Sequence, residues 1–554
     1  MRVHLRLLCG HRAHGHRIHG LCVLMSRIGQ LVMAAAAGIS LPLAAHTKDL
    51  NVSGTLDGTT AIIALEGNVG HYYSGHLQPG KAEVYIFAPN ATDKRLLARG
   101  SGGSERIHFV AATDEPQLEV VGAKGTDYEI ILTRRTPNGS QAAPTHELRS
   151  PKLQQTLTAL QAGANSDAFW TDVSAQGTPL IEHVDGRTLM TFLYRGAANN
   201  VRLLGGPSSD HDWLARLGDS DIWYKTYEVP EETRLSYRLA PDVPRFDGNP
   251  RDQRMAILAT AAADPLNHAP WPKTAPSRWQ QWSTVSLENA PVQPGFPLKG
   301  SETQELTSES FASDILGNRR EITFFRSENF SPDANDAVLL FMFDGPRAIA
   351  EMQIPQMLDR LTASQAIPPV AAVFIDPIDV AHRGAELPGN PDFSAFLAQE
   401  LLPRALQHFG MEHDRTRTVL AGASYGGIGS TNAALDQPQS FGNVISLSGS
   451  YWWAPKGAAS DNGLSYVANR LIESDLSEEI RFFIGAGRFE TSTTGHYEIR
   501  ETSRQLHAVL QAKGVESHWC EYDGGHDSFV WRGGYGDGLI ALFGDCARVC
   551  DDSE

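Results

Sequence analysis

The pattern of hydrophobic and polar positions divides most of the chain into three regions. Short apolar runs with period-two alternation fill residues 47–135 and 166–287, whereas longer apolar runs alternate with helical patterns over 301–545. A polar stretch containing proline, 136–150, and a stretch with three prolines, 289–297, separate these regions as linkers. A chain of 554 residues is long enough for three or four domains.

The first region has the pattern of a β-sandwich. Glycine, asparagine and aspartate turns separate its β-rich runs, which cover 82–88, 106–111, 117–121 and 127–132. With Gly54-Thr55-Leu56 near its start and the late strand at Gly125-x-x-Tyr128, this region resembles the pre-peptidase C-terminal-like β-sandwich.

The second region is also predicted to be mainly β. Residues 189–195 (LMTFLYR) are predicted to form an alternating apolar strand. A dense aromatic series follows, and we expect it to pack in the core and between the sheets: Trp213, Trp223, Tyr224, Tyr227 and Tyr237.

The third region predicts a mostly parallel sheet covered by helices on both faces. Its continuous apolar runs at 337–343 and 370–375 are typical of strands buried on both sides, and a helical pattern over 393–409 precedes a third strand at 417–421. The predicted fold class is therefore multidomain, with N-terminal β-sandwich domains followed by a C-terminal α/β domain.

A candidate nucleophile lies directly after the third strand. Gly422-Ala423-Ser424-Tyr425-Gly426 has the Gly-x-Ser-x-Gly pattern, and a helical stretch, 428–435, follows it. This strand–turn–helix context is that of the nucleophile elbow of α/β-hydrolases, in which Gly422 and Gly426 relieve crowding around the serine. The amide of Tyr425, at the helix N-terminus, is positioned to stabilise an oxyanion.

A serine nucleophile needs a base, which in this fold follows it in the chain. The candidates are His496, His507, His518 and His526. We favour His526, since it comes directly after a strand at 517–522 and two glycines, whereas His507 lies in a helical pattern and His518 within the strand.

The orienting acid is expected after the preceding strand, 481–484. Glu490 is the first carboxylate there, while Asp527, next to the predicted base, fits a loop or cap position better. Asp461, Glu473 and Asp475 are weaker candidates, and a Ser–His dyad without an acid is the remaining alternative.

These motifs resemble the enterobactin (enterochelin) esterase family, whose catalytic domain is an esterase-D-like α/β-hydrolase. The resemblance covers about residues 166–545. In the second region it rests on GTPLIE (177–182), FLYR (192–195), DSDIWY (219–224), SYRLAPD (236–242) and DPLN (264–267). In the third region it rests on GASYGG (422–427), SGSYWW (448–453) and GGHDSFVWRGG (524–534). Upstream of the serine, the matching residues are Ile375-Asp376, His382-Arg383, Glu386-Leu387-Pro388 and Asn390.

The resemblance implies hydrolysis of the tri-lactone backbone of a ferric catecholate siderophore. Ser424 would be the nucleophile, His526 its base and Glu490 the acid, and the Tyr425 amide would share the oxyanion with an amide after the 337–343 strand. The family usually has an aromatic residue after its Asp-Gly turn, but here Asp344-Gly345 precedes Pro346, which has no N–H to donate. The chemistry needs no metal or cofactor, so iron enters only as part of the substrate.

The charge of the chain bears on such a substrate. With 47 Lys+Arg against 64 Asp+Glu, the net charge is −17, which argues against nucleic-acid binding and would repel a trianionic ferric complex. Local cations and aromatic rings are therefore expected at the site, and the candidates lie in loops near the predicted catalytic residues: Arg347, Arg383, Arg488, Arg532, Trp452, Trp453 and Trp531.

The N-terminal segment predicts export. Residues 1–45 contain five arginines and no acid, and Arg27 precedes an apolar run, 31–45, that ends in small residues. This is the order of a secretory signal peptide starting at Met25, with residues 1–24 as a spurious extension, and the run is too short to span a membrane. Cleavage near Ala45 would move the net charge from −17 to −22 and leave three cysteines, enough for one disulfide. The expected location is the periplasm, or the cytoplasm without this signal.

Two other functions remain open from the sequence. A general carboxylesterase acting on feruloyl or acetyl esters would share the elbow and the histidine, but it would not need the second region or the arginines. A siderophore- or glycan-binding protein with a structural Ser424 would not need the ordered series of serine, acid and histidine.

Overall fold

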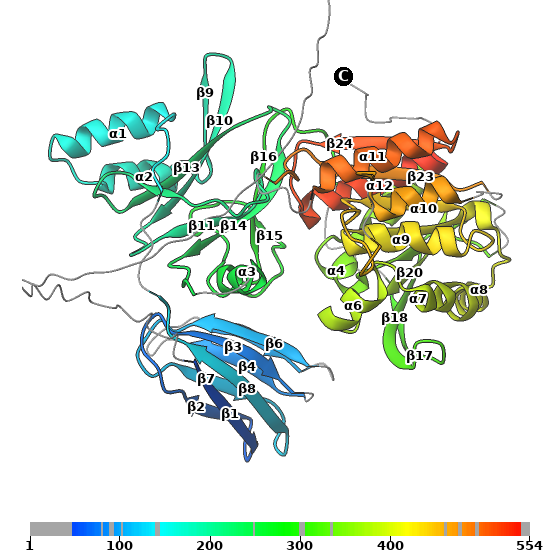
Figure 1. The fold of residues 1–554 in the computed structure, drawn as a ribbon, viewed down its shortest axis with the longest axis horizontal. Helices are drawn as coiled ribbons and strands as arrows, with labels where there is room; N and C mark the ends of the chain where they lie inside the picture. Colours follow the sequence, from blue (N-terminus) through cyan, green and yellow to red (C-terminus); the bar gives the residue numbers. More distant parts are fainter. Residues whose placement is uncertain are drawn as a thin grey trace, which may run out of the picture. The chain divides into compact units, whose positions relative to one another are not determined.

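An eight-stranded sheet forms the C-terminal domain in the computed structural model of this protein (Figure 1). The structure describes residues 47–544 apart from 79–80, 88–93, 101–103, 139–143, 247–249, 298–304, 333–335, 459–461, 475–478 and 493–497. The signal peptide predicted for residues 1–45 lies outside the described residues. Within those ranges, no helix has the length and apolarity needed to cross a membrane.

The order of the strands in this sheet is β17-β18-β20-β19-β21-β22-β23-β24. From β20 to β24 neighbouring strands pair in parallel, while β17 and β18 form an antiparallel edge. The strands are β17 (Thr307–Ser313), β18 (Asn318–Arg326), β19 (Val338–Met342), β20 (Val370–Ile375), β21 (Thr418–Ala423), β22 (Asn443–Leu447), β23 (Arg481–Gly487) and β24 (Ser517–Tyr522).

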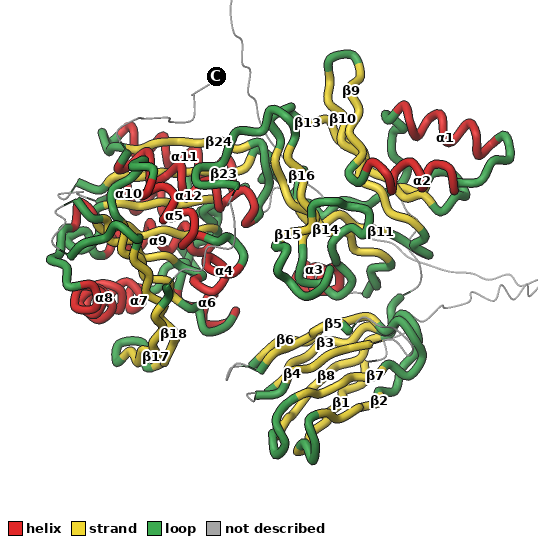
Figure 2. The backbone as a smooth tube through the Cα atoms, turned by 180° about the vertical axis from the view of Figure 1, so that it is seen from behind, coloured by secondary structure: helices red, strands yellow, loops and turns green. Residues whose placement is uncertain are grey.

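Helices cover both faces of this sheet, as the buried apolar strands predict. One face packs on α7 (Pro391–Phe396), α8 (Leu402–Phe409), α9 (Tyr425–Asp436), α10 (Tyr466–Glu473) and α11 (Ile499–Ala512). The other face packs on α4 (Gly345–Ala350), α5 (Ile354–Ala363) and α12 (Ser528–Phe543), and α6 (Val380–Glu386) follows β20 (Figure 2).

The helix predicted over 393–409 is interrupted in the structure. Between α7 and α8 the backbone makes a π-helical turn, Leu397–Leu401. Pro403 lies in the first turn of α8 and has no N–H to donate, so the α-helical ladder cannot run unbroken through this point.

The N-terminal domain is a sandwich of two four-stranded antiparallel sheets, β1-β8-β3-β6 and β2-β7-β4-β5. All four predicted runs are strands, but the sequence did not predict four others, because their apolar positions are few or interrupted. In β3, Gly75 lies where a Cβ would be 1.9 Å from the carbonyl oxygen of Ile131. The strands are β1 (Thr47–Thr55), β2 (Thr60–Ala64), β3 (Tyr72–Leu77), β4 (Glu83–Phe87), β5 (Arg95–Arg99), β6 (Glu105–Val110), β7 (Gln117–Val121) and β8 (Asp127–Arg135).

The middle domain holds two further four-stranded sheets, β12-β13-β10-β9 and β11-β14-β16-β15. Trp223, Tyr224 and Tyr237 are buried in its cores, as expected for the aromatic series. Its strands are β9 (Leu180–Val184), β10 (Arg187–Arg195), β11 (Val201–Gly205), β12 (Ala215–Arg216), β13 (Ile222–Val229), β14 (Arg234–Pro241), β15 (Pro270–Trp271) and β16 (Trp282–Ser286), and its helices are α1 (Pro151–Gln161), α2 (Asp167–Gln176) and α3 (Pro250–Leu258).

The start of the middle domain differs from the predicted boundary at 166. Helix α1 begins at Pro151, and its Leu153 is buried with Trp170 of α2 and Leu193 of β10 in one cluster. Ser150 caps α1 by accepting a hydrogen bond from the amide of Leu153. The polar linker therefore ends at this cap, as its composition predicts, and the middle domain begins about fifteen residues before the predicted boundary.

The sandwich and the middle domain share a buried contact. The ring of Tyr72 in β3 lies 4.9 Å from that of Phe246, within an apolar cluster that includes residues of α3. The guanidinium of Arg95 donates to the carbonyl oxygens of Ala259 at 2.5 Å and Leu258 at 3.3 Å. Residues 45–554 accordingly group as one compact unit.

Candidate active site

Ser424 lies at the sharp turn between β21 and α9. Its backbone has φ 59° and ψ −119°, a conformation that a serine adopts only under strain. The turn is tight because a Cβ at position 422 would lie 2.5 Å from the backbone carbon and oxygen of Gly426. The serine is therefore held out at the end of the strand, as predicted for a nucleophile elbow.

The second glycine that this turn requires is Gly427 and not Gly426. A Cβ on Gly426 would meet its nearest neighbour, Phe343, at an ordinary 3.5 Å, whereas a Cβ on Gly427 would lie 2.7 Å from Oγ of Ser446. Helix α9 packs closely against β22 at this point. The Gly-x-Ser-x-Gly pattern did not predict this contact, because it depends on the neighbouring strand.

The predicted acid and base are in contact. Nδ1 of His526, in the loop between β24 and α12, lies 2.7 Å from Oε2 of Glu490, which follows β23 and is almost fully buried. A Cβ on Gly487 would lie 2.9 Å from Oε1 of this carboxylate, so glycine is required beside it. This contact sets the His526 tautomer that leaves Nε2 able to accept a proton.

Those of the weaker candidates that the structure describes are not part of this arrangement. Glu473 is exposed at the end of α10, and Asp527 caps α12 by accepting hydrogen bonds from the amides of Phe529 and Val530. His507 lies in α11 and His518 in β24, as predicted. His496, Asp461 and Asp475 are outside the described residues.

Among the described residues, no hydrogen bond joins the Ser424 hydroxyl to His526. Oγ of Ser424 lies 3.4 Å from Oγ of Ser450 instead, at the edge of hydrogen-bond distance. In hydrolases without substrate, the hydrogen bond between the serine and the histidine is often long, and it shortens when the substrate binds.

Glu490 accepts hydrogen bonds from two donors besides His526. Its Oε1 accepts hydrogen bonds from the Gly487 amide at 2.7 Å and from the Ser448 hydroxyl at 2.5 Å. The Ser448 hydroxyl in turn accepts a hydrogen bond from Nε1 of Trp531 at 2.8 Å. Ser448 follows β22 with a φ of 49°. The sequence did not reveal this role, because Ser448 reaches the acid across the sheet rather than along the chain.

Ser448→Ala should lower kcat about tenfold, which is the usual cost of one hydrogen bond to a charged group. Alanine shares the Cβ of serine, so the backbone strain is unchanged. Ser446→Ala is the matched control, since it removes a buried hydroxyl whose hydrogen bond, among the described residues, is to Tyr451. Steady-state kinetics and thermal melts would check this, and equal losses in both variants would contradict a specific role for Ser448.

The middle domain holds the loops that carry the base and the acid. The amide of Arg234, at the start of β14, donates to the carbonyl oxygen of Asp523 at 2.9 Å, and the hydroxyl of Ser209 donates to that of Phe489 at 3.1 Å. A Cβ on Gly524 would lie 2.7 Å from the carbonyl oxygen of Arg234. The glycine before His526 thus lets β14 approach this loop.

Asp527 makes this interface depend on pH. It also accepts a hydrogen bond from the amide of Ser236 in β14, at 3.2 Å, and burial raises its pKa from 3.8 to about 7. Between pH 4 and 7 the unfolded chain loses this proton while the folded protein retains it, so this group lowers stability as the pH rises.

Asp527→Asn should therefore flatten the fall in Tm between pH 5 and pH 8. Asparagine caps the helix without a charge, but its NH₂ group cannot accept from the Ser236 amide, so Tm should be lower at every pH while its slope becomes flatter. Thermal melts across this range would check the prediction. An unchanged slope in the variant would show that Asp527 is ionised throughout in the folded protein.

The oxyanion region is bounded by Tyr425 and by the segment that follows β19. Tyr425 is the first residue of α9, and Asp344 has a left-handed backbone with φ 55° at the start of α4. Both carboxylate oxygens of Asp344 accept hydrogen bonds from Arg383 at 2.6 Å, and Nη2 of Arg383 lies 3.4 Å from the carbonyl oxygen of Ala423. Arg383 therefore ties this segment to the residue before Ser424.

The other predicted arginines differ in their surroundings. Arg347, in α4, is exposed. Arg488 pairs with Glu521 at 3.2 Å and Asp523 at 2.9 Å. Arg532, which was predicted to bind substrate, is instead engaged by residues of the protein itself. It donates a hydrogen bond to Oε1 of Gln293, and its guanidinium lies over the rings of Phe296, Phe529 and Trp271.

The predicted tryptophans are also spread over different surroundings. Trp452 lies 6.1 Å from the Tyr425 ring, whereas Trp453 packs against Tyr466 and the apolar core. Trp531 is buried, and its ring packs edge-to-face on the His526 ring with 4.8 Å between the ring centroids, so it helps to fix the orientation of the base. Among the described residues, no group of three or more His, Cys, Asp and Glu side chains is placed to hold a metal ion.

These features define the class of protein. A strained serine at a strand–helix turn, followed in the chain by a buried glutamate in contact with a histidine, is the arrangement of a serine esterase with the α/β-hydrolase fold. The family model "Putative esterase" matches residues 313–541, and the model "Enterochelin esterase, N-terminal" matches residues 189–296.

The chain belongs to the iron(III) enterobactin esterase family. It is 32% identical over 431 residues to the iron(III) enterobactin esterase of Dickeya dadantii, covering 69% of this chain and 94% of that protein. It is also 32% identical to the enzyme of the same name from Escherichia coli K12, over 60% of this chain and 81% of the relative. A crystal structure of the enterobactin esterase from Shigella flexneri in the presence of enterobactin aligns with a TM-score of 0.56 and 28% identity, over 69% of this chain and 98% of that one.

Proposed function

We propose that this protein is a serine esterase that hydrolyses the tri-serine lactone of ferric enterobactin-type catecholate siderophores. The observation that carries the proposal is the contact between Glu490 and His526, in a chain that has Ser424 at a strained strand–helix turn and covers 94% of a relative named iron(III) enterobactin esterase. Iron enters as part of the substrate, and the reaction draws on no cofactor.

The reaction uses each of these groups in turn. Ser424 Oγ attacks the ester carbonyl while His526 Nε2 takes its proton, and the developing oxyanion is stabilised by the Tyr425 amide and by the segment after β19. The proton then passes to the leaving serine hydroxyl, which releases the alcohol and leaves an acyl-enzyme. Water, deprotonated by His526, hydrolyses this ester and restores Ser424.

Incubation of the purified protein with ferric and iron-free enterobactin, followed by mass spectrometry, tests this proposal. The expected result is stepwise ring opening and cleavage to dihydroxybenzoylserine units. Turnover of simple aryl esters with enterobactin left intact would instead favour the general carboxylesterase. Binding of enterobactin without any hydrolysis would favour a siderophore-binding protein.

We also propose that the enzyme acts in the periplasm after cleavage of a signal peptide near Ala45. The proposal rests on the sequence of residues 1–45 and is supported by the disulfide bond of Cys520, since disulfides persist in oxidising compartments. Cell fractionation with mass spectrometry of the mature N-terminus tests it. A mature protein that starts upstream of Ala45 and stays in the cytoplasm would contradict the proposal.

A further inference from the structure

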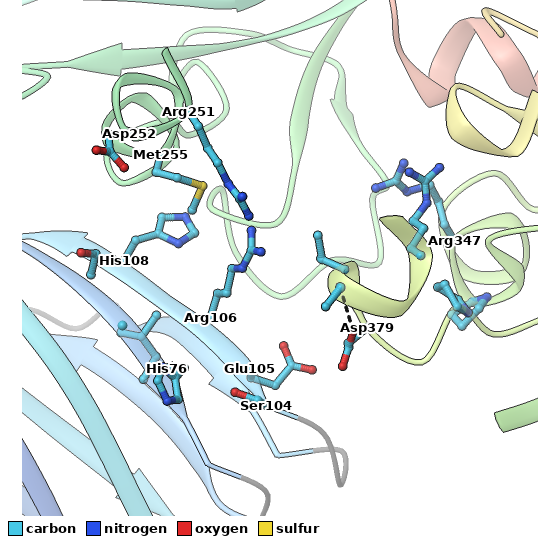
Figure 3. A pocket seen from close by; sticks show the side chains of 18 of the residues that line it. His76, Ser104, Glu105, Arg106, His108, Arg251, Asp252, Met255, Arg347 and Asp379 are labelled. Atoms are coloured by element: carbon cyan, nitrogen blue, oxygen red, sulfur yellow. Dashed lines mark hydrogen bonds between the residues drawn. The ribbon is translucent and has the colours of Figure 1, made fainter. Parts of the chain in front are cut away.

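A cavity of about 680 Å³ lies among parts of all three domains. Its walls come from β3 and β6 of the sandwich, from α3 of the middle domain, and from the segments around α4 and α6 of the esterase domain (Figure 3). This volume is within the range of sites that bind small molecules. Arginines line it from every side: Arg106, Arg135, Arg251, Arg347 and Arg383.

Five carboxylates line this cavity, and each already has a partner: Glu105 is engaged, and Oδ1 of Asp376 accepts a hydrogen bond from the amide of Ile378 at 2.7 Å. Asp344 is paired with Arg383 at 2.6 Å, and Asp252 lies 3.5 Å from Arg135. Asp379 caps α6 by accepting hydrogen bonds from the backbone amides of residues 381 and 382. These acids are therefore engaged within the protein and do not neutralise the remaining arginines.

Three arginines remain without such a pair. Arg106, Arg251 and Arg347 are exposed, and no carboxylate in the described part of the chain lies within 4 Å of their guanidinium groups. Figure 3 shows the side chains of Arg106 and Arg251 pointing toward one another across the cavity. Two cations that face each other repel, and a bound anion removes this repulsion while accepting hydrogen bonds from both.

The cavity and the candidate active site share the segment after β19. Asp344, Pro346 and Arg347 line the cavity, and the same segment borders the oxyanion region. Arg383 also lines it and contacts the carbonyl oxygen of Ala423, one residue before Ser424. Arg383 and this segment therefore join the wall of the cavity to the residue before the nucleophile.

We propose that this cavity binds the ferric tris-catecholate part of the substrate, with Arg106 of the sandwich and Arg251 of the middle domain as specificity-determining residues. This inference rests on the proposed function. Iron binding deprotonates the catechols, so the ferric complex is trianionic whereas the iron-free ligand is uncharged. In a chain with a net charge of −17, local arginines are what attracts such an anion. The sandwich is thus part of the substrate site.

Charge reversal in the cavity tests the proposal. Arg106→Glu and Arg251→Glu should each raise the KM for ferric enterobactin at least tenfold at low ionic strength, with kcat nearly unchanged. Hydrolysis of a neutral aryl ester should be unaffected. Lys124→Glu is the matched control, because it makes the same change in net charge at an exposed position of the same sandwich, outside the cavity. Its KM should change less than twofold.

Two results would overturn the proposal: an unchanged KM for the ferric complex in Arg106→Glu and Arg251→Glu, or an equal rise in Lys124→Glu. Failure of the proposed function is seen separately, as an absence of enterobactin cleavage by the wild type. In that case, tryptophan fluorescence quenching by the ferric complex still tests the cavity, with Ser424→Ala as the parent protein to prevent turnover. Weaker quenching after Arg106→Glu would support the proposal, and equal quenching would overturn it.

Discussion

Replacement of Ser424 by alanine should lower ester hydrolysis about a millionfold, since the loss of the nucleophile removes the acyl-enzyme route altogether. The fold should be unaffected, because alanine keeps the Cβ that the strained turn already accommodates at φ 59°. Binding of the ferric complex should persist, which separates recognition from chemistry.

Ser430→Ala is the control for this experiment. Ser430 lies in α9, the helix that follows Ser424, and within the described part of the chain its buried hydroxyl donates to the carbonyl oxygen of Gly426. Its activity should stay within about threefold of the wild type, as expected for the loss of one neutral hydrogen bond away from the reacting atoms. If Ser424→Ala retained activity within tenfold of the wild type, another residue would have to be the nucleophile.

Glu490→Gln should lower kcat about ten-thousandfold, in line with the loss of the acid in other serine hydrolases. Three donors converge on this carboxylate: the Gly487 amide, the Ser448 hydroxyl and Nδ1 of His526. Glutamine has only one oxygen, and the fixed amide of Gly487 needs it. Its NH₂ group then faces Nδ1, which must become the acceptor, so Nε2 carries the proton and cannot act as the base.

The control for this variant tests the assignment of the acid. Glu473→Gln changes the same group at an exposed position on α10, and it should leave kcat unchanged. Kinetics of both variants, with circular dichroism to check folding, give the answer. A small loss in Glu490→Gln together with a large one in Glu473→Gln would move the acid to α10.

The sequence was most informative where chemistry and local structure coincide. Ser424 could be predicted because its turn needs a glycine, a strand before it and a helix after it, all within a few residues. Glu490 and His526 each follow a strand, and parallel strands bring their ends to the same edge of a sheet. The structure places these two side chains in contact.

The parts that the sequence did not predict depend on contacts between distant segments. Ser448 and Gly427 act across neighbouring elements, and Arg532 is enclosed by rings from several segments that no local pattern brings together. Several strands of the sandwich were also not predicted. They are half-exposed, so polar residues interrupt their apolar positions, and their pairing with distant strands is not visible in the local pattern. In each case the deciding partner is remote in the chain.

The contact of the middle domain with the loops that carry the acid and the base has a practical consequence. Arg234 and Ser209 each bind the backbone of one loop, so the alignment of Glu490 with His526 depends on how firmly the two domains are docked. A binder that separates β14 from the loop before α12 would act as an allosteric inhibitor. Such a binder would inhibit ester hydrolysis without competing for the substrate site, so it would not need to resemble a siderophore.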